Sequence, residues 1–104
     1  MQIDEKKVRY VDRPEVSETF VDNVRMISVD GRNMKMEFCV TRAEEPKGNQ
    51  LPGGTRYPAC RLVMSVETAI ELVNQLQGLF TAMEQQGMIK RNPPQSPPGD
   101  QTVQ

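Results

Sequence analysis

The chain has 104 residues, 37% of them hydrophobic and 26% charged, which is enough for one compact domain and too little for two separate cores. It contains no histidine, and this excludes imidazole acid–base catalysis, serine or cysteine triads and histidine-ligated metal sites. The net charge of −1 leaves no positive field that would attract nucleic acid or an anionic membrane. We therefore expect one small domain that binds neither nucleic acid nor membrane.

The first eighteen residues form a charged segment without apolar periodicity. Nine charged side chains surround a single apolar stretch at residues 8–11, which ends before Asp12-Arg13-Pro14. We interpret residues 1–18 as a flexible arm that contains at most a short edge strand. The sequence shows neither the apolar core of a signal peptide nor the ~18 consecutive apolar residues of a membrane span, so we predict a cytoplasmic protein.

Residues 20–29 are rich in β-branched side chains and stop at Asp30-Gly31, a dipeptide that suits the positive φ angles of a tight hairpin turn. The returning strand alternates between two faces. Met34, Met36, Phe38 and Val40 form one, here called the methionine face, and Lys35, Glu37, Cys39 and Thr41 form the other. This alternation predicts a hairpin whose methionine face is buried and whose opposite face is solvated.

The first strand of this hairpin is less regular than the second. Val24 and Met26 share one parity, whereas Ile27 and Val29 share the other. Either a β-bulge shifts the register near Ile27, or both faces of the strand are partly covered.

A loop and a third strand follow the hairpin. Residues 43–54 contain two prolines and three glycines, which predicts an exposed and mobile loop. The third strand is expected at residues 57–64. Its alternation places Cys60, Leu62 and Met64 on one side and Tyr57, Ala59, Arg61 and Val63 on the other.

Ser65 stands directly before a helical pattern, where its hydroxyl can accept from an unpaired backbone N–H, and Glu67 suits the positive end of the helix dipole. Gly87 supplies a C-terminal stop. Between them, apolar side chains recur at helical spacing at Ala69, Ile70, Val73, Leu76, Phe80 and Met83, with Leu72 and Leu79 widening the stripe. The pattern predicts one amphipathic helix of about twenty residues.

The C-terminal residues are rich in proline, with four prolines between Asn92 and Gly99. We predict a disordered tail at residues 91–104, which leaves a single domain at residues 19–90. The spacing of Pro94 and Pro97 matches the PxxP pattern that SH3-type domains bind, although a solvated tail is the simpler interpretation.

These elements predict an α+β fold: a small antiparallel sheet of about three strands, a hairpin plus a third strand, packed by one long C-terminal amphipathic helix. Such a helix spans ~30 Å, longer than the strands, so part of its stripe overhangs the sheet. A second copy of the chain most simply covers the remaining apolar surface and the open strand edges. We expect a homo-oligomer, with a dimer favoured, whose interaction surface comprises Leu72, Leu76, Leu79, Phe80, Met83, Met34 and Met36.

No group of side chains indicates catalysis, a cofactor or a metal. Asp22, Asp30 and Glu37 could approach one another in the hairpin, but nothing in their spacing brings two to one pocket, and we interpret them as solvated charges. Gly53-Gly54-Thr55 lacks the lysine of a phosphate loop and precedes a strand, so it is interpreted as a turn. We expect no catalytic residue, no cofactor and no metal ligand.

Cys39 and Cys60 can form at most one disulfide, and no CxxC pair is present. We interpret them as two reduced, buried thiols, with a disulfide as the alternative. Asp22, Asn23, Glu44 and Glu45 could contact a hard cation, but the twelve-residue spacing of a calcium loop does not occur.

Seven methionines are the one unusual enrichment. Flexible thioethers can line a surface that accommodates varied apolar segments, although they also fill irregular cores. Our leading hypothesis is a non-enzymatic, oligomeric interaction protein whose further protein partner is unidentified. The alternative is a chaperone-like binder of apolar peptide segments, and a carboxylate-based enzyme is a third hypothesis.

One stretch of the chain resembles a known family. The order Glu18-Thr19-Phe20-Val21-Asp22-Asn23-Val24, then Met36-Glu37-Phe38, then Arg61-Leu62-Val63-Met64-Ser65 before the apolar helix resembles small bacterial and archaeal proteins known only as a domain of unknown function. The resemblance spans about residues 18–86, and Val66 stands where such proteins often carry proline. It implies the fold above and no activity. The order of strands and helix is also reminiscent of SecB-type export chaperones, which supports the peptide-binding alternative only by analogy.

Overall fold

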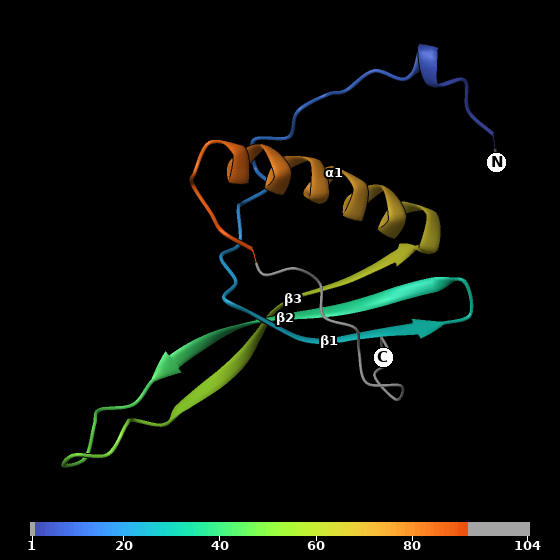
Figure 1. Ribbon diagram of the computed structural model, residues 1–104. Helices are drawn as coiled ribbons and strands as arrows, with labels where there is room; N and C mark the ends of the chain where they lie inside the picture. The colour runs from blue at the N-terminus through green and yellow to red at the C-terminus, as the bar shows by residue number, and fades with distance from the viewer. Residues whose placement is uncertain (1, 92–104) are drawn as a thin grey trace.

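The computed structural model describes residues 2–91, which form a three-stranded antiparallel sheet followed by one helix (Figure 1). The strands are β1 (Asn23–Asp30), β2 (Asn33–Ala43) and β3 (Gly54–Ser65), in the order β1-β2-β3; the helix is α1 (Val66–Gln85), and one 3₁₀ turn, η1 (Glu5–Lys7), lies in the N-terminal arm. The predicted small α+β fold is confirmed. The predicted tail lies outside the described residues, except for Arg91.

The β1–β2 hairpin forms where Asp30-Gly31 predicts it. The register pairs Asp30 with Asn33, so Gly31 and Arg32 form a two-residue loop, and Gly31 has a φ of 63°. A glycine with positive φ at the first loop position is the arrangement of a type II′ turn, whose twist matches that of the flanking strands.

β1 begins at Asn23 rather than at Phe20, where the predicted apolar run starts. Asp22 closes this end of the sheet: its N–H donates to the Cys39 carbonyl at 3.0 Å, and its carboxylate accepts from the N–H and the hydroxyl of Thr41, each at 3.1 Å. Because the carboxylate takes the Thr41 N–H, a longer β1 has no partner for its next ladder bond. Residues 2–20 therefore leave the sheet as an exposed arm.

A β-bulge accounts for the irregular pattern of β1. The register with β2 shifts between Val24 and Met26, which makes Arg25 the extra residue. Val24 and Ile27 consequently share a face although parity separates them, because both pair with residues of the methionine face. Of the two predicted alternatives, the bulge near Ile27 is confirmed, and its extra residue is Arg25.

β3 is longer than the predicted residues 57–64 and contains a bulge of its own. It pairs with β2 from Gly54 to Ser65, and the register shift between Cys60 and Pro58 makes Ala59 the extra residue. Tyr57 therefore pairs with Val40 and lies on the methionine face, which corrects the predicted alternation. Beyond the end of β1, β2 and β3 continue as a two-stranded projection (Figure 1).

The N-terminus of α1 begins at the predicted cap. The Ser65 hydroxyl accepts from the Thr68 N–H at 3.1 Å, which satisfies one of the N–H groups that the first turn leaves unpaired. We expect Ser65→Ala to lower the free energy of unfolding by about 1 kcal/mol in urea denaturation. Ser65→Asp keeps an acceptor oxygen and should change it by less than about 0.5 kcal/mol. Equal losses in the two variants would contradict the cap.

The C-terminus of α1 ends at the predicted glycine. Gly87 has a φ of 76°, its N–H donates to the Glu84 carbonyl at 3.0 Å, and the Met88 N–H donates to the Met83 carbonyl at 2.9 Å. These two bonds form a Schellman motif, which favours glycine because the capping residue is left-handed.

α1 lies across the methionine face, and its first turns are where helix and sheet meet (Figure 1). The Val66 N–H donates to the Arg32 carbonyl at 3.1 Å, which ties the start of the helix to the β1–β2 turn. Ala69 is the one buried residue of α1, all of which is described. Its small side chain allows close approach at this point, whereas Leu76 and Leu79 farther along are 39% and 61% exposed.

Buried side chains lie on both faces of the sheet, which corrects the prediction of one solvated face. Met36 on the methionine face is 9% exposed, while Glu37 and Cys39, at 9% and 1%, lie on the outer face, the sheet face turned away from α1. Cys39 is enclosed because it sits on the central strand between its partners Asn23 and Pro58. The core is small: among the described residues, the buried hydrophobic side chains are Met36, Cys39 and Ala69. The chain is also extended, with a radius of gyration of 18.4 Å against about 13 Å for a compact domain of this size.

Candidate functional site

The predicted interaction surface is divided between helix and sheet. Its three leucines, Leu72, Leu76 and Leu79, are 37%, 39% and 61% exposed and are named here the leucine stripe. The remaining four are less accessible: Phe80, Met83 and Met34 are half-buried, and Met36 is buried. The accessible part of the predicted surface is therefore the leucine stripe.

The leucine stripe belongs to a regular series along α1. Ala69, Leu72, Leu76, Leu79 and Met83 are separated by three, four, three and four residues. This is the a/d spacing with which two helices pack along a common seam. The predicted apolar stripe of the helix thus contains a narrower seam, which the spacing of these residues alone reveals.

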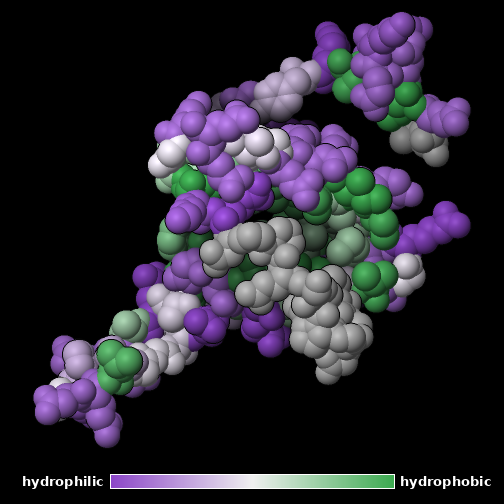
Figure 2. Space-filling view, viewed as in Figure 1, coloured by the Kyte–Doolittle hydropathy of each residue, from purple (hydrophilic) through white to green (hydrophobic). Residues whose placement is uncertain are grey.

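A second apolar surface lies on the other flank of the helix, between α1 and the methionine face. It is a groove of about 370 Å³, lined by Ile27, Met34, Met36, Ala69, Ile70 and Val73, with Asn74 at its side. Figure 2 shows hydrophobic atoms gathered below the helix, whose visible surface is mainly polar. Successive helical residues are turned by about 100°, so Val73 lines the groove whereas its neighbour Leu72 belongs to the leucine stripe.

Residues after the helix cover its C-terminal end. The Arg91 guanidinium lies 5.3 Å from the centroid of the Phe80 ring and donates to Glu84 Oε1 at 2.7 Å. This cation–π contact partly covers Phe80 and explains why Phe80 is less accessible than the leucines. The hydrogen bond from Arg91 lowers the pKa of Glu84.

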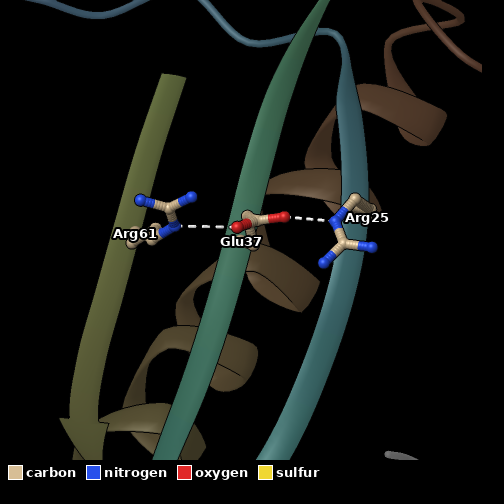
Figure 3. Close-up of polar contacts among 3 residues, drawn as sticks. All are labelled: Arg25, Glu37 and Arg61. Carbon is tan, nitrogen blue, oxygen red and sulfur yellow. Dashed lines mark hydrogen bonds and ion pairs between the residues drawn. The ribbon is translucent and has the colours of Figure 1, made fainter. Parts of the chain in front are cut away.

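Glu37 forms an ion-pair triad across all three strands on the outer face (Figure 3). Its Oε1 accepts from Arg25 Nε on β1, and its Oε2 accepts from Arg61 Nε on β3 at 2.8 Å. The bulge at Arg25 and the direct pairing of Glu37 with Arg61 bring the three side chains together. The prediction that Glu37 is a solvated charge is therefore wrong: it is the central, buried member of a triad.

The triad is built to keep Glu37 ionised. Hydrogen bonds from Arg25, and then from Arg61, hold the pKa of Glu37 below its ordinary value, against a smaller opposing effect of burial. The pKa of Arg25 is raised in turn, chiefly by its hydrogen bond to Glu37. A carboxylate with both oxygens engaged and a lowered pKa is poorly suited to take up and release protons near neutral pH.

This pKa predicts a pH dependence of stability. The folded-state pKa of Glu37 lies below the unfolded value near 4.5, so the triad stabilises fully above pH 4.5 and loses its contribution as the pH falls toward the folded-state pKa. We expect the urea midpoint to decrease on acidification in that range, and to decrease less in Glu37→Gln. Glu84, whose pKa is also lowered, titrates in the same direction, so Glu84→Gln is the matched comparison. Identical acid profiles for Glu37→Gln and the unmodified chain would contradict the triad's role.

The other carboxylates considered as acid–base candidates lie in separate places. Asp30 pairs with Lys35 at 3.3 Å, and Asp22 holds Thr41 at the opposite end of β1. Each of the three candidates, Asp22, Asp30 and Glu37, therefore has partners of its own. Within the described chain, no group of three or more Cys, Asp or Glu side chains is placed to hold a metal ion.

The two cysteines lie on opposite faces of the sheet. Cys60 pairs with Phe38 on the methionine face, whereas Cys39, the next residue of β2, points to the outer face. Both are free thiols, Cys39 buried and Cys60 half-buried, and side chains on opposite faces cannot form a disulfide without backbone movement.

Gly54 of the predicted turn begins β3, where a Cβ atom would lie 2.9 Å from the Arg42 carbonyl oxygen. Glycine is therefore needed there for close approach of the two strands. The predicted turn at Gly53-Gly54-Thr55 is wrong, because Gly54 and Thr55 already pair with β2, and the turn of this loop lies at Gly48-Asn49.

Comparison with known proteins adds no relative. No protein-family model matches the chain, and no curated protein or solved structure matches it. The resemblance to the domain of unknown function therefore stays a prediction. No helix within residues 2–91 is long and apolar enough to cross a membrane.

Proposed function

We propose that this chain is a non-enzymatic interaction protein that works as a homo-oligomer, a dimer in its simplest form. The observation that carries the proposal is the leucine stripe, three leucines in a helix-pairing seam that remain 37–61% exposed. Exposed leucines at this spacing are the typical signature of a helix that packs against another helix.

A second copy of the same chain is the simplest partner for this seam. A two-fold dimer brings the same stripe of both protomers together, so a single surface satisfies both sides. The leucine stripe carries no charged side chain that would select an oppositely charged partner. All five residues of the a/d series that contains it, from Ala69 to Met83, are apolar. Helix-to-helix packing of two copies covers what the protomer's own sheet leaves exposed.

The non-enzymatic part of the proposal is supported by the state of the ionisable groups. The chain has no histidine, and the carboxylates considered as acid–base candidates are each engaged in an ion pair or a backbone cap. The large apolar groove contains one polar lining residue, Asn74, and no ionisable one. Such a surface suits packing rather than chemistry.

The test is the mass of the full chain in solution. Light scattering behind size exclusion, at concentrations down to tens of micromolar, should give a discrete dimer, and a second sample ending after Arg91 should give the same assembly. A monomer across the whole range would overturn the proposal. Substitutions in the stripe, described in the Discussion, locate the interface.

A second candidate function is binding of apolar peptide segments, favoured by the open groove with its two methionines, Met34 and Met36. Methionine side chains adapt to varied apolar partners. Titration with an unfolded client chain, followed by amide NMR shifts, should then perturb groove residues such as Val73. Unchanged shifts at saturating client would exclude this candidate.

A further inference from the structure

The N-terminal arm carries apolar side chains that its own protomer leaves uncovered. Every described residue from 2 to 20 is exposed. Six large apolar side chains of the arm are more than half exposed: Ile3, Val8, Tyr10, Val11, Val16 and Phe20. An extended segment with this many bare apolar groups gains stability when another surface covers them.

The base of the arm is fixed, and it directs the arm away from the groove. The bonds from Asp22 to Thr41 and Cys39 hold the last arm residues at the end of the sheet. From there the chain passes the helix and runs on the side of α1 opposite the sheet, while the groove opens between α1 and the strands (Figure 1). Arm and groove of one protomer thus remain apart, each with unburied apolar surface.

A short part of the arm is enough to fill the groove. The eleven residues from Tyr10 to Phe20 reach ~36 Å when extended, which is longer than the two turns of α1, Ala69 to Asn74, that line the groove. The groove volume of about 370 Å³ has room for a few apolar side chains of the arm. Its lining and the arm's bare side chains are both apolar, and the arm's charged residues between them can stay in solvent.

We propose that the two protomers exchange arms, so that apolar side chains from residues 10–20 of one fill the groove between α1 and the sheet of the other. The inference rests on the proposed dimer and deepens it, because the groove of each protomer is completed by side chains of its partner. Exchange of an identical segment is a low-cost route to a dimer, since two-fold symmetry forms the same contact twice. The partner's arm lies along the side of α1 that carries Val73. The leucine stripe on the other side of the helix remains available for helix pairing.

The test uses the full chain with a photo-reactive benzophenone amino acid in place of Tyr10. Equal amounts of ¹⁴N- and ¹⁵N-labelled protein are mixed, allowed to exchange subunits and irradiated, and the cross-linked peptides are identified by mass spectrometry. We expect cross-links from residue 10 to peptides containing Val73 or Met36, about half of them joining a ¹⁴N to a ¹⁵N peptide, as random pairing of subunits requires. The control carries the same group at Leu51, which is 94% exposed on the distant β2–β3 loop and should give no cross-link to the groove.

The outcomes separate the two proposals. Groove cross-links that join only like-labelled peptides, in a sample whose subunits do exchange, would show that the arm folds onto its own protomer and overturn the exchange. A dimer with no cross-link from residue 10 to the groove would overturn it as well, while the dimer itself stands. A monomer by light scattering would overturn both. Loss of the mixed cross-links in Val73→Gln, with the dimer retained, would further support the groove as the binding surface.

Discussion

Leu76→Glu should convert the dimer into a monomer. Leu76 is the middle residue of the leucine stripe and is 39% exposed in the single protomer, which is the surface a partner helix would cover. An unpaired carboxylate at the centre of an interface costs at least about 2 kcal/mol. A two-fold dimer carries the substitution twice, so a total near 4 kcal/mol should weaken association about a thousandfold. Light scattering over a dilution series measures the change.

The matched control is Thr81→Glu, which adds the same charge on another side of the helix. Thr81 is exposed, is turned by about 140° from Leu76, and has no leucine of the stripe three or four residues away. It should leave the dimer intact, and circular dichroism should show both variants to be helical. If Leu76→Glu stays dimeric at the dilution where the unmodified chain does, the leucine stripe is not the interface.

Met36→Ala should be the most destabilising single truncation on the sheet. Met36 is 9% exposed at the centre of β2, where it lies beneath the helix among the lining residues of the groove. Removing most of a buried methionine side chain loses its transfer free energy and leaves a cavity, which together lower the free energy of unfolding by about 2–5 kcal/mol. Urea denaturation measures this loss, with all variants at one protein concentration because dimer stability depends on concentration.

Met26→Ala removes the same atoms from a different environment. Met26 lies on β1 and is 42% exposed, so its truncation loses less buried surface and should cost less than about 1 kcal/mol. A loss at Met36 no larger than that at Met26 would show that the methionine face is not the protomer's core. It would also weaken the assignment of the groove as a preformed surface.

Local signals in the sequence predicted the hairpin turn and both ends of the helix, although not the starts of β1 and β3. Gly31 and Gly87 adopt positive φ angles of 63° and 76°, and Ser65 caps the helix through its hydroxyl. Each of these positions is decided by the conformational needs of a few neighbouring residues, so the sequence contains the whole cause. The alternation of side chains between the two faces of β2 was also predicted, because a side-chain period of two depends only on the strand itself.

The register between neighbouring strands could not be predicted from the sequence in the same way. The extra residues Arg25 and Ala59 change which side chains share a face. The sequence indicated only that either a bulge lay near Ile27 or both faces of the first strand were partly covered. The triad depends on this register, since Arg25, Glu37 and Arg61 come from three strands. Glu37 therefore looked like a surface charge, although pairing with two arginines compensates its burial.

The sequence by itself determined the order of strands and helix, the turn and cap positions and the amphipathic character of α1, because these follow from backbone preferences and short-range periodicity. Only the tertiary structure decided how much apolar surface the protomer covers, since that depends on the distance between α1 and the sheet. It showed close contact at Ala69, a groove on one flank of the helix and the leucine stripe exposed on the other. Those long-range distances decide which surfaces are left for a second copy of the chain.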